Sequence, residues 1–178
     1  YDRAVLKIDA EALAEAHRRL HLPPPIVKTI APTSQHSGQV YRYTTENPGD
    51  GWERPDFDDS GWKRGPGGFG TDGTPGAVVG TEWKTGEIWL RRTVTLDSAE
   101  LHEPALILHH DEDAEVYLNG QRAVSASGYT TSYETFPVAK AAAAALNKGA
   151  NVIAIHCRQT RGGQYIDVGL VDTLPPKE

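Results

Sequence analysis

The sequence has no methionine, a single cysteine and no long apolar run, and each absence excludes something. Cys157 has no second cysteine to pair with, so no disulfide forms within the chain, and its place in the run VIAIHC is typical of a buried core residue. No stretch reaches the roughly 18 apolar residues of a membrane-spanning helix, and the N-terminus lacks the basic-then-apolar order of a signal peptide. We therefore expect no membrane partner. The missing methionine indicates a processed or excised piece of a larger protein.

Positive charge is also scarce in this chain. The formal net charge is −6 at pH 7, and no run of lysine and arginine offsets it locally. Binding to the phosphate backbone of a nucleic acid requires such a basic patch. We therefore expect no nucleic-acid partner.

Short apolar runs divided by turns are the main feature that is present. From position 39 onward seven such runs follow one another, and the 18 glycines and 12 prolines suit the turns between them. This pattern predicts an all-β fold, an antiparallel β-sandwich or jelly roll, formed by residues 39–178. The runs are QVYRYTT, EIWLRRTVTL, PALILHH, AEVYLNG, RAVSA, NVIAIHC and QYIDVGLV.

One convincing helix precedes the strands. The segment DAEALAEAHRRLHLPPP begins with Asp9, a good N-cap, and a helix there would end before Pro23. We interpret residues 1–38 as a short N-terminal helix and linker, the tail of a preceding domain. A second segment, residues 139–149, has helical propensity but directly precedes a strand, so either a short helical turn or an irregular connection fits.

The stretch HHDEDAEVYLNG raises the question of a metal site. Neighbouring residues of one strand point to opposite faces, so the histidines and carboxylates of residues 109–113 would rarely converge on one ion. The preferred interpretation is structural. The acidic residues connect two strands, the second strand places Val116 and Leu118 toward the core, and Asn119 and Gly120 make the next turn. We expect no metal here.

No catalytic pattern stands out. Adjacent carboxylates such as Asp58 with Asp59, or Asp111 with Asp113, seldom face each other across the groove that glycoside hydrolysis needs. The sequence contains no G-x-S-x-G motif for acyl transfer, and GPGGFGTDG lacks the Lys-Ser/Thr ending of a phosphate-binding loop. We therefore predict no catalytic residues.

Aromatic side chains in the loops are a better signal. A glycine-rich stretch, residues 57–86, is too long for an ordinary connection, and it contains two tryptophans. Aromatic rings pack against the C–H faces of sugars, while side chains such as Arg158 and Gln164 can bind paired hydroxyls. Trp62 and Trp89 are instead expected to fill the core.

Taken in order, six motifs resemble the galactose-binding-like β-sandwich, in particular the jelly-roll sugar-binding domain at the front of family 2 glycoside hydrolases. The resemblance covers roughly residues 40 to 173, and it rests on FDDSGWKRGPGGFG, GEIWLRRTVTL, DEDAEVYLNGQRAV, SGYTTSYETFPV, LNKGANVIAIHC and GGQYIDVGLV. It implies that Asp111 and Asp113, ahead of a core strand, are structural. Such enzymes carry their catalytic carboxylates on a following barrel, which this chain lacks, so the resemblance does not transfer catalysis.

The resemblance also sets expectations for cofactors, partners and location. Members of the wider fold often hold a structural calcium ion, but no D-x-D-x-D-G loop indicates one here, so we expect no cofactor. The implied partners are a glycan and a neighbouring catalytic domain of the same polypeptide. The implied location is secreted, periplasmic or at the cell surface of a bacterium.

Strands that alternate in direction would bring four loops to one end of the sandwich, residues 70–86, 109–113, 125–134 and 157–164. Binding usually resides in loops gathered on a rigid scaffold. The predicted ligand-binding residues are Asp72, Trp83, His110, Tyr129, Tyr133, Arg158, Arg161 and Gln164.

Three functions fit these observations. The leading hypothesis is a non-catalytic carbohydrate-binding module of a multidomain polysaccharide-processing enzyme. The alternatives are a structural spacer that packs on a catalytic neighbour without binding sugar, and an independent hydrolase.

Overall fold

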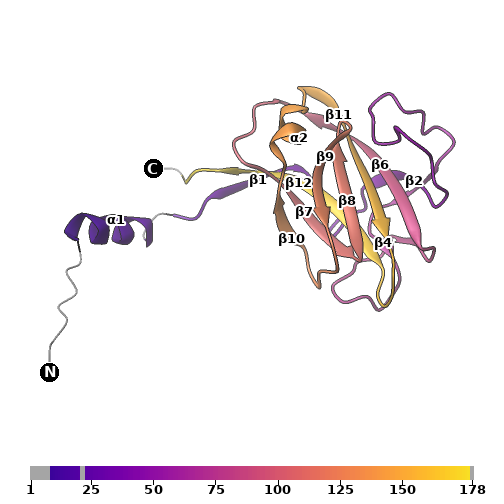
Figure 1. Ribbon diagram of the computed structural model, residues 1–178, viewed down its shortest axis with the longest axis horizontal. Helices are drawn as coiled ribbons and strands as arrows, with labels where there is room; N and C mark the ends of the chain where they lie inside the picture. Colours follow the sequence, from indigo (N-terminus) through magenta and orange to yellow (C-terminus); the bar gives the residue numbers. More distant parts are fainter. Residues whose placement is uncertain (1–8, 21–22, 177–178) are drawn as a thin grey trace.

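The computed structural model describes residues 9–20 and 23–176 and shows two packed β-sheets with a helix standing away from them (Figure 1). The first six-stranded sheet, sheet A, has the order β10 (Glu134–Pro137), β7 (Pro104–Asp111), β12 (Tyr165–Leu174), β4 (Phe69–Gly70) and β5 (Thr81–Glu82), with β1 (Ile26–Ala31) also paired to β12. The second, sheet B, has the order β3 (Lys63–Pro66), β2 (Val40–Thr44), β6 (Glu87–Leu96), β11 (Gly149–Arg158), β8 (Asp113–Leu118) and β9 (Gln121–Ala126). The predicted all-β sandwich is confirmed. All pairings are antiparallel except the short parallel pair of β4 and β5.

The core lies between the two sheets and is built from alternate residues of each strand. Leu108 and Val168 of sheet A face inward, as do Val116 and Ile155 of sheet B, because strand side chains alternate between the two faces. Trp89, Val116 and Leu118, which the sequence assigned to the core, are buried, and so are Val152, Ile153 and Ile155 in β11.

The two tryptophans assigned to the core have different positions. Trp89 is buried, but on the outer face of sheet B, where its ring stacks on His156 at 4.6 Å between centroids. Trp62 is only half-buried and packs against Phe57, so its assignment to the core was wrong. It follows a strand-free segment and precedes β3, and from there its ring does not reach the space between the sheets.

The N-terminal segment is part helix and part sheet. The predicted helix is present as α1 (Ala10–Leu20), and the Asp9 carboxylate caps it by accepting a hydrogen bond from the Glu11 N–H at 2.9 Å. Within the predicted linker, however, residues 26–31 form β1, and Ala31 belongs to the core. The sandwich therefore begins before position 39. The pairing of β1 with β12 makes this segment part of the sandwich. The sequence IVKTIA has no apolar alternation that would have predicted a strand here.

The structure also settles the conformation of the alanine-rich segment 139–149 and of the glycine-rich stretch 57–86. The alanine-rich segment contains a helical turn, α2 (Lys140–Ala144), with Ala142 buried against the core. The glycine-rich stretch 57–86 is not a single loop, because it contains β3, β4 and β5.

The four loops do gather at one end of the sandwich, the lower end in Figure 1. Backbone hydrogen bonds tie them together: Gln159 N–H donates to Gly86 at 2.8 Å, Thr71 to Gln164 at 2.9 Å and Thr130 to His110 at 2.9 Å. The strand directions predicted from the sequence are therefore confirmed. We call this region the loop end.

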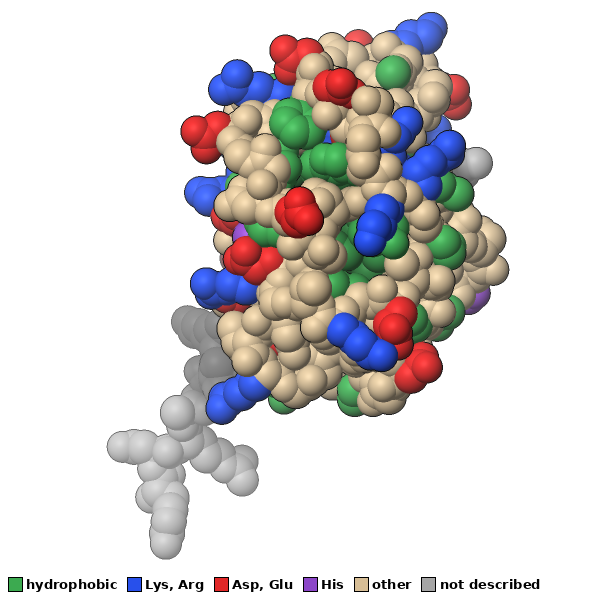
Figure 2. Space-filling view, turned by 90° about the vertical axis from the view of Figure 1, so that its right-hand side faces the viewer, with side chains coloured by type: hydrophobic (Ala, Val, Ile, Leu, Met, Phe, Trp, Pro, Cys, Tyr) green, Lys and Arg blue, Asp and Glu red, His purple; other side chains and the backbone are tan. Residues whose placement is uncertain are grey.

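The surface on the side of β2 carries mixed charge. Figure 2 shows Lys and Arg interspersed with Asp and Glu, and hydrophobic side chains in separate small areas. No helix in the described part of the chain has the length and apolar character needed to cross a membrane.

Candidate functional site

A cleft of about 380 Å³ opens at the loop end, and we call it the loop cleft. The turn between β7 and β8 forms one wall, and segments from three other loops complete it. Tyr129 stands on this wall with 68% of its surface exposed, and exposed Arg161 lies on the opposite loop. The lining residues are Pro75, Asp111, Glu112, Tyr129, Thr130, Thr131, Arg161, Gly162 and Gly163.

The backbone around Tyr129 is anchored on both sides. Gly128 N–H donates to the Asp113 carboxylate at 3.0 Å, and Thr130 exchanges hydrogen bonds with the His110 backbone through both its N–H and its hydroxyl. Tyr129 itself is bridged to Asp111 across the cleft wall. The exposed ring is thus carried by a fixed backbone, which lowers the entropy lost when a ligand stacks on it.

Close packing shapes the floor of the loop cleft. A Cβ at Gly163 would lie 2.3 Å from an Asp111 carboxylate oxygen, so only glycine lets the two loops approach. Burial raises the pKa of Asp111, and the negative charge of Glu112 acts in the same direction. The cleft therefore offers an aromatic face, a guanidinium group and acceptor oxygens, the groups that bind sugars.

Three of the predicted site residues are buried beneath the loops, a fourth is half-buried, and all four side chains are used within the protein. Trp83 is only 2% exposed, and its indole N–H donates to the Thr85 hydroxyl at 2.9 Å. Gln164 is buried and donates to the Thr85 carbonyl at 2.7 Å. The predicted roles of Trp83 as a stacking surface and Gln164 as a hydroxyl ligand are wrong, because both side chains hold the β5–β6 connection in place.

His110 is the third buried position, and Tyr133 is the half-buried one. His110 faces the core, where its ring contacts Phe136 and its Nδ1 lies 2.6 Å from the Glu112 carbonyl. The half-buried Tyr133 donates its hydroxyl to Asp167 at 2.7 Å. Both side chains are therefore used within the protein, which corrects their predicted contact with a ligand.

A buried polar cluster lies under these loops, on the outer face of sheet A. Asp167 accepts hydrogen bonds from Tyr133 and from the Ser34 N–H at 2.6 Å, and burial raises its pKa. Opposite Asp167 in the register, His109 packs against the rings of Tyr133 and Tyr165. Neither ring nitrogen of His109 has a hydrogen-bond partner among the described residues, and burial lowers its pKa. This cluster is a structural anchor beneath the loop cleft.

The four remaining predicted residues do not form one site. Arg161 and Tyr129 share the loop cleft. Asp72 is exposed on the turn between Thr71 and Thr74 and does not line that cleft. Arg158 belongs to a second cleft, which the sequence did not predict.

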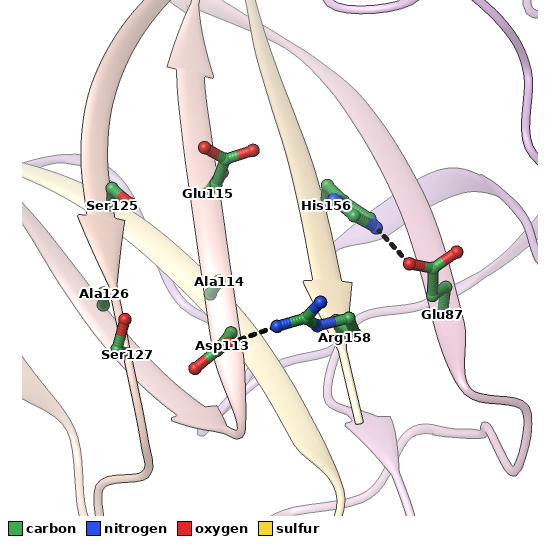
Figure 3. Close-up of a pocket in the computed structure, with 9 residues that line it drawn as sticks. All are labelled: Glu87, Asp113, Ala114, Glu115, Ser125, Ala126, Ser127, His156 and Arg158. Carbon is green, nitrogen blue, oxygen red and sulfur yellow. Dashed lines mark hydrogen bonds and ion pairs between the residues drawn. The ribbon is translucent and has the colours of Figure 1, made fainter. Parts of the chain in front are cut away.

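This second cleft, of about 290 Å³, lies on the outer face of sheet B, and we call it the sheet cleft (Figure 3). Figure 3 shows Arg158 reaching to Asp113 on β8, with Nη2 to Oδ2 at 2.9 Å, and His156 reaching to Glu87 on β6, with Nε2 to Oε1 at 3.6 Å. Glu115 on β8 also lines it. Strand register brings these side chains together, since Arg158 lies opposite both Asp113 and Glu87.

Two of the three carboxylates that line the sheet cleft are paired with arginines, Asp113 with Arg158 and Glu115 with Arg122. The Gly128 N–H and then the Arg158 guanidinium lower the pKa of Asp113, and burial lowers the pKa of His156. Glu115 accepts hydrogen bonds from Arg122 and Tyr117, both at 3.1 Å. Among the described residues, no group of three or more His, Cys, Asp or Glu side chains is arranged to hold a metal ion.

Comparisons with known proteins find similar structures but no similar sequence. No protein-family model matches the chain, and no curated protein matches it. Solved structures do match. They include a Bacteroides uniformis β-glucuronidase (22% identity, TM-score 0.56, 85% of this chain and 18% of that one) and a glycosyl hydrolase family 2 member from Bacteroides cellulosilyticus (15% identity, TM-score 0.56, 83% and 20%). A β-glucuronidase from an uncultured Clostridium species covers 98% of this chain and 31% of its own, at 12% identity and a TM-score of 0.50.

These matches are informative in one respect. The chain spans between 18% and 31% of the length of the enzymes it resembles, so the likeness concerns a part of each enzyme. At this level of identity the likeness shows a shared fold. The chain therefore has the fold of a β-sandwich segment found in family 2 glycoside hydrolases.

Proposed function

We propose that this chain is a non-catalytic accessory domain of a glycoside-processing enzyme, and that it binds a glycan in the loop cleft. The observation that carries the proposal is the exposed ring of Tyr129, held on an anchored backbone beside Arg161. The ring provides a stacking surface for a sugar, and the guanidinium group provides paired donors for hydroxyls.

The structural matches support the enzyme context of this proposal. Two of the three matched proteins are β-glucuronidases and the third is a glycosyl hydrolase family 2 member, and the matching region is a minor part of each. We assign the sandwich to the galactose-binding-like jelly roll, and a catalytic domain of the same polypeptide as its neighbour. A bacterial protein working on polysaccharides outside the cytoplasm fits these assignments.

A glycan array followed by calorimetric titration tests the proposal. Tyr129→Ala should weaken binding about tenfold, which corresponds to about 1.4 kcal/mol. Tyr129→Phe keeps the ring and should bind like the wild type, so it is the matched control. Equal affinity of wild type and Tyr129→Ala would exclude the loop cleft as the site.

A spacer function is the second candidate, and one surface favours it. Val27 on β1 is exposed and lines a groove of about 300 Å³ together with Pro32 and Val171, and its neighbour in the chain, Ile26, is also exposed. Such an apolar area suits contact with a catalytic neighbour. The absence of binding to any glycan on the array would favour this function.

A further inference from the structure

Three arginines lie in one row across neighbouring strands on the outer face of sheet B. In the register, Arg42 on β2 lies opposite Arg64 on β3 and opposite Arg91 on β6. Residues opposite each other in antiparallel strands project from the same face, and like charges in that position repel. The row therefore needs a counter-charge.

The chain supplies that charge only in part. Asp59 contacts two of the arginines, with Oδ1 3.2 Å from Arg42 Nε and Oδ2 2.8 Å from Arg91 Nε. Arg91 is buried and also donates to the backbone carbonyls of Trp52 and Arg54, so it fixes the segment before β3. Both oxygens of Asp59 are thus occupied.

Arg64 differs from its two neighbours. It is exposed, and among the described residues no carboxylate lies within ion-pairing distance of it. The carboxylate of Asp58, on which the charge of Arg42 acts, accepts the Ser60 N–H at 2.9 Å, and this hydrogen bond lowers the pKa of Asp58. Arg64 therefore has donors available to a ligand.

A cleft of about 280 Å³ adjoins this row, and we call it the arginine cleft. Its lining residues include the three arginines of the row and Asp59, which leaves a local charge of +2 in a chain of net charge −6. Counting Asp58 as well still leaves +1. The lining residues are Val40, Tyr41, Arg42, Asp59, Arg64, Arg91, Arg92 and Thr93.

The fourth arginine approaches from the edge between the sheets. Arg92 donates to the Pro32 carbonyl at 2.8 Å and lies over the Tyr41 ring, 5.5 Å from its centroid. It is held in place by these contacts rather than by a carboxylate. The sequence did not predict this patch, because its arginines come from three separate strands and only the register assembles them.

We propose that the arginine cleft binds an oxyanion group of an acidic sugar, a carboxylate or a sulfate ester. Arginine is suited to this task because its planar fork of donors matches two oxygens of a carboxylate or sulfate. Arg64 provides that fork. Arg42, whose Nη1 donates to the carbonyls of Asp59 and Ser60 at 3.2 and 3.1 Å, adds positive charge beside it, and Arg91 with Asp59 fixes the floor. The site lies on another face than the loop cleft, and it stands whether or not the loop cleft binds a glycan.

An NMR titration of the ¹⁵N-labelled chain at low ionic strength tests this inference. The probes are D-glucuronate, glucose 6-sulfate, inorganic sulfate and, as the neutral control, D-glucose. We expect the acidic sugars to shift the resonances of residues 42, 64 and 91–93, and we expect added salt to weaken the effect. D-glucose should leave these resonances unchanged. A response to only one acidic sugar would identify which oxyanion binds, and inorganic sulfate shows whether the sugar ring contributes.

Two matched variants make the test specific. Arg64→Gln should weaken binding about tenfold, because it removes the unpaired guanidinium. Arg122→Gln, an exposed arginine on β9 that pairs with Glu115, should bind like the wild type. The inference is overturned if no probe shifts these resonances, if D-glucose shifts them equally, or if the two variants bind alike. Shifts confined to residues 129–131 and 161–163 would likewise overturn it while supporting the loop cleft.

Discussion

The loop end has a buried side and an exposed side, and the same loops build both. On the buried side, Tyr133 is hydrogen-bonded to Asp167, and Trp83 to Thr85. On the exposed side, Tyr129 projects from the same β9–β10 connection as Tyr133 into the loop cleft. The difference shows that one group of aromatic and polar residues fixes the loops, and another is left free to bind. Substitutions on the two sides should therefore separate stability from binding.

The largest effect is expected at Trp83. Because its side chain is almost completely buried, Trp83→Ala should leave a cavity and lower the free energy of unfolding by about 3 to 5 kcal/mol. Urea denaturation measures this loss. Tyr129→Ala, on the exposed side, should change it by less than about 0.5 kcal/mol. If both variants unfold at the same urea concentration, the division into two sides is wrong.

A smaller loss of stability is expected at Tyr133. Tyr133→Phe removes a donor to the buried carboxylate of Asp167, which then keeps the Ser34 N–H as a partner. Leaving a buried acceptor underused costs about 1 to 3 kcal/mol. Tyr43→Phe is the control, because the Tyr43 hydroxyl makes no hydrogen bond to another described residue. Thermal unfolding compares the melting temperatures of the two variants. Equal melting temperatures would contradict the role of Tyr133 in holding the loops.

On the exposed side, Arg161→Ala should weaken glycan binding several-fold, less than Tyr129→Ala does, because an exposed hydrogen bond contributes only about 1 kcal/mol. Its stability should match that of the wild type, since Arg161 makes no ion pair within the described chain. Titration calorimetry compares the two affinities. A loss of stability in Arg161→Ala would assign this residue to the buried side.

The smallest effect concerns pH. Burial lowers the pKa of His109 in the folded state below its usual 6.5, so the unfolded chain binds a proton more readily. The stability associated with neutral His109 is complete above about pH 6.5 and is lost as the pH falls through that value. His156 acts in the same direction, whereas the raised pKa values of Asp111 and Asp167 act in the opposite direction at lower pH.

His109→Phe isolates this contribution. Phenylalanine keeps the ring contacts and removes two nitrogens without partners, so stability near neutral pH should not fall. The decline in unfolding free energy between about pH 7.5 and pH 5.5 should become shallower. His36→Phe, a substitution at an exposed histidine outside this cluster, is the matched control. A steeper profile in His109→Phe would contradict the assignment.

The sequence predicted those parts of the fold that depend on local pattern. The Asn119–Gly120 turn is present, with φ angles of 48° and 84°, and alternation in AEVYLN placed Val116 and Leu118 in the core. The meeting of the loops followed from strand direction. By contrast, β1 was not predicted. Five of its six residues are not buried, so its sequence has no apolar pattern, and it is a strand because it pairs with β12.

The candidate sites were predicted less well, for a physical reason. Trp83 and Tyr129 both lie in glycine-rich or polar segments, and only the packing of the loops distinguishes a buried ring from an exposed one. The sheet cleft and the arginine cleft are assembled from residues that are distant in sequence and adjacent in register. Alternation along each strand indicates which residues share a face, but the strand order is needed to bring them together.

The most direct test of the proposed glycan site is an NMR map of the chain titrated with the best glycan from the array. We predict that the largest shifts fall on residues 129–131 and 161–163, around the loop cleft, and that Tyr129→Ala abolishes them while the dispersion of the spectrum is retained. Shifts that fall instead on the outer face of sheet B or on β1, and persist in Tyr129→Ala, would contradict this account.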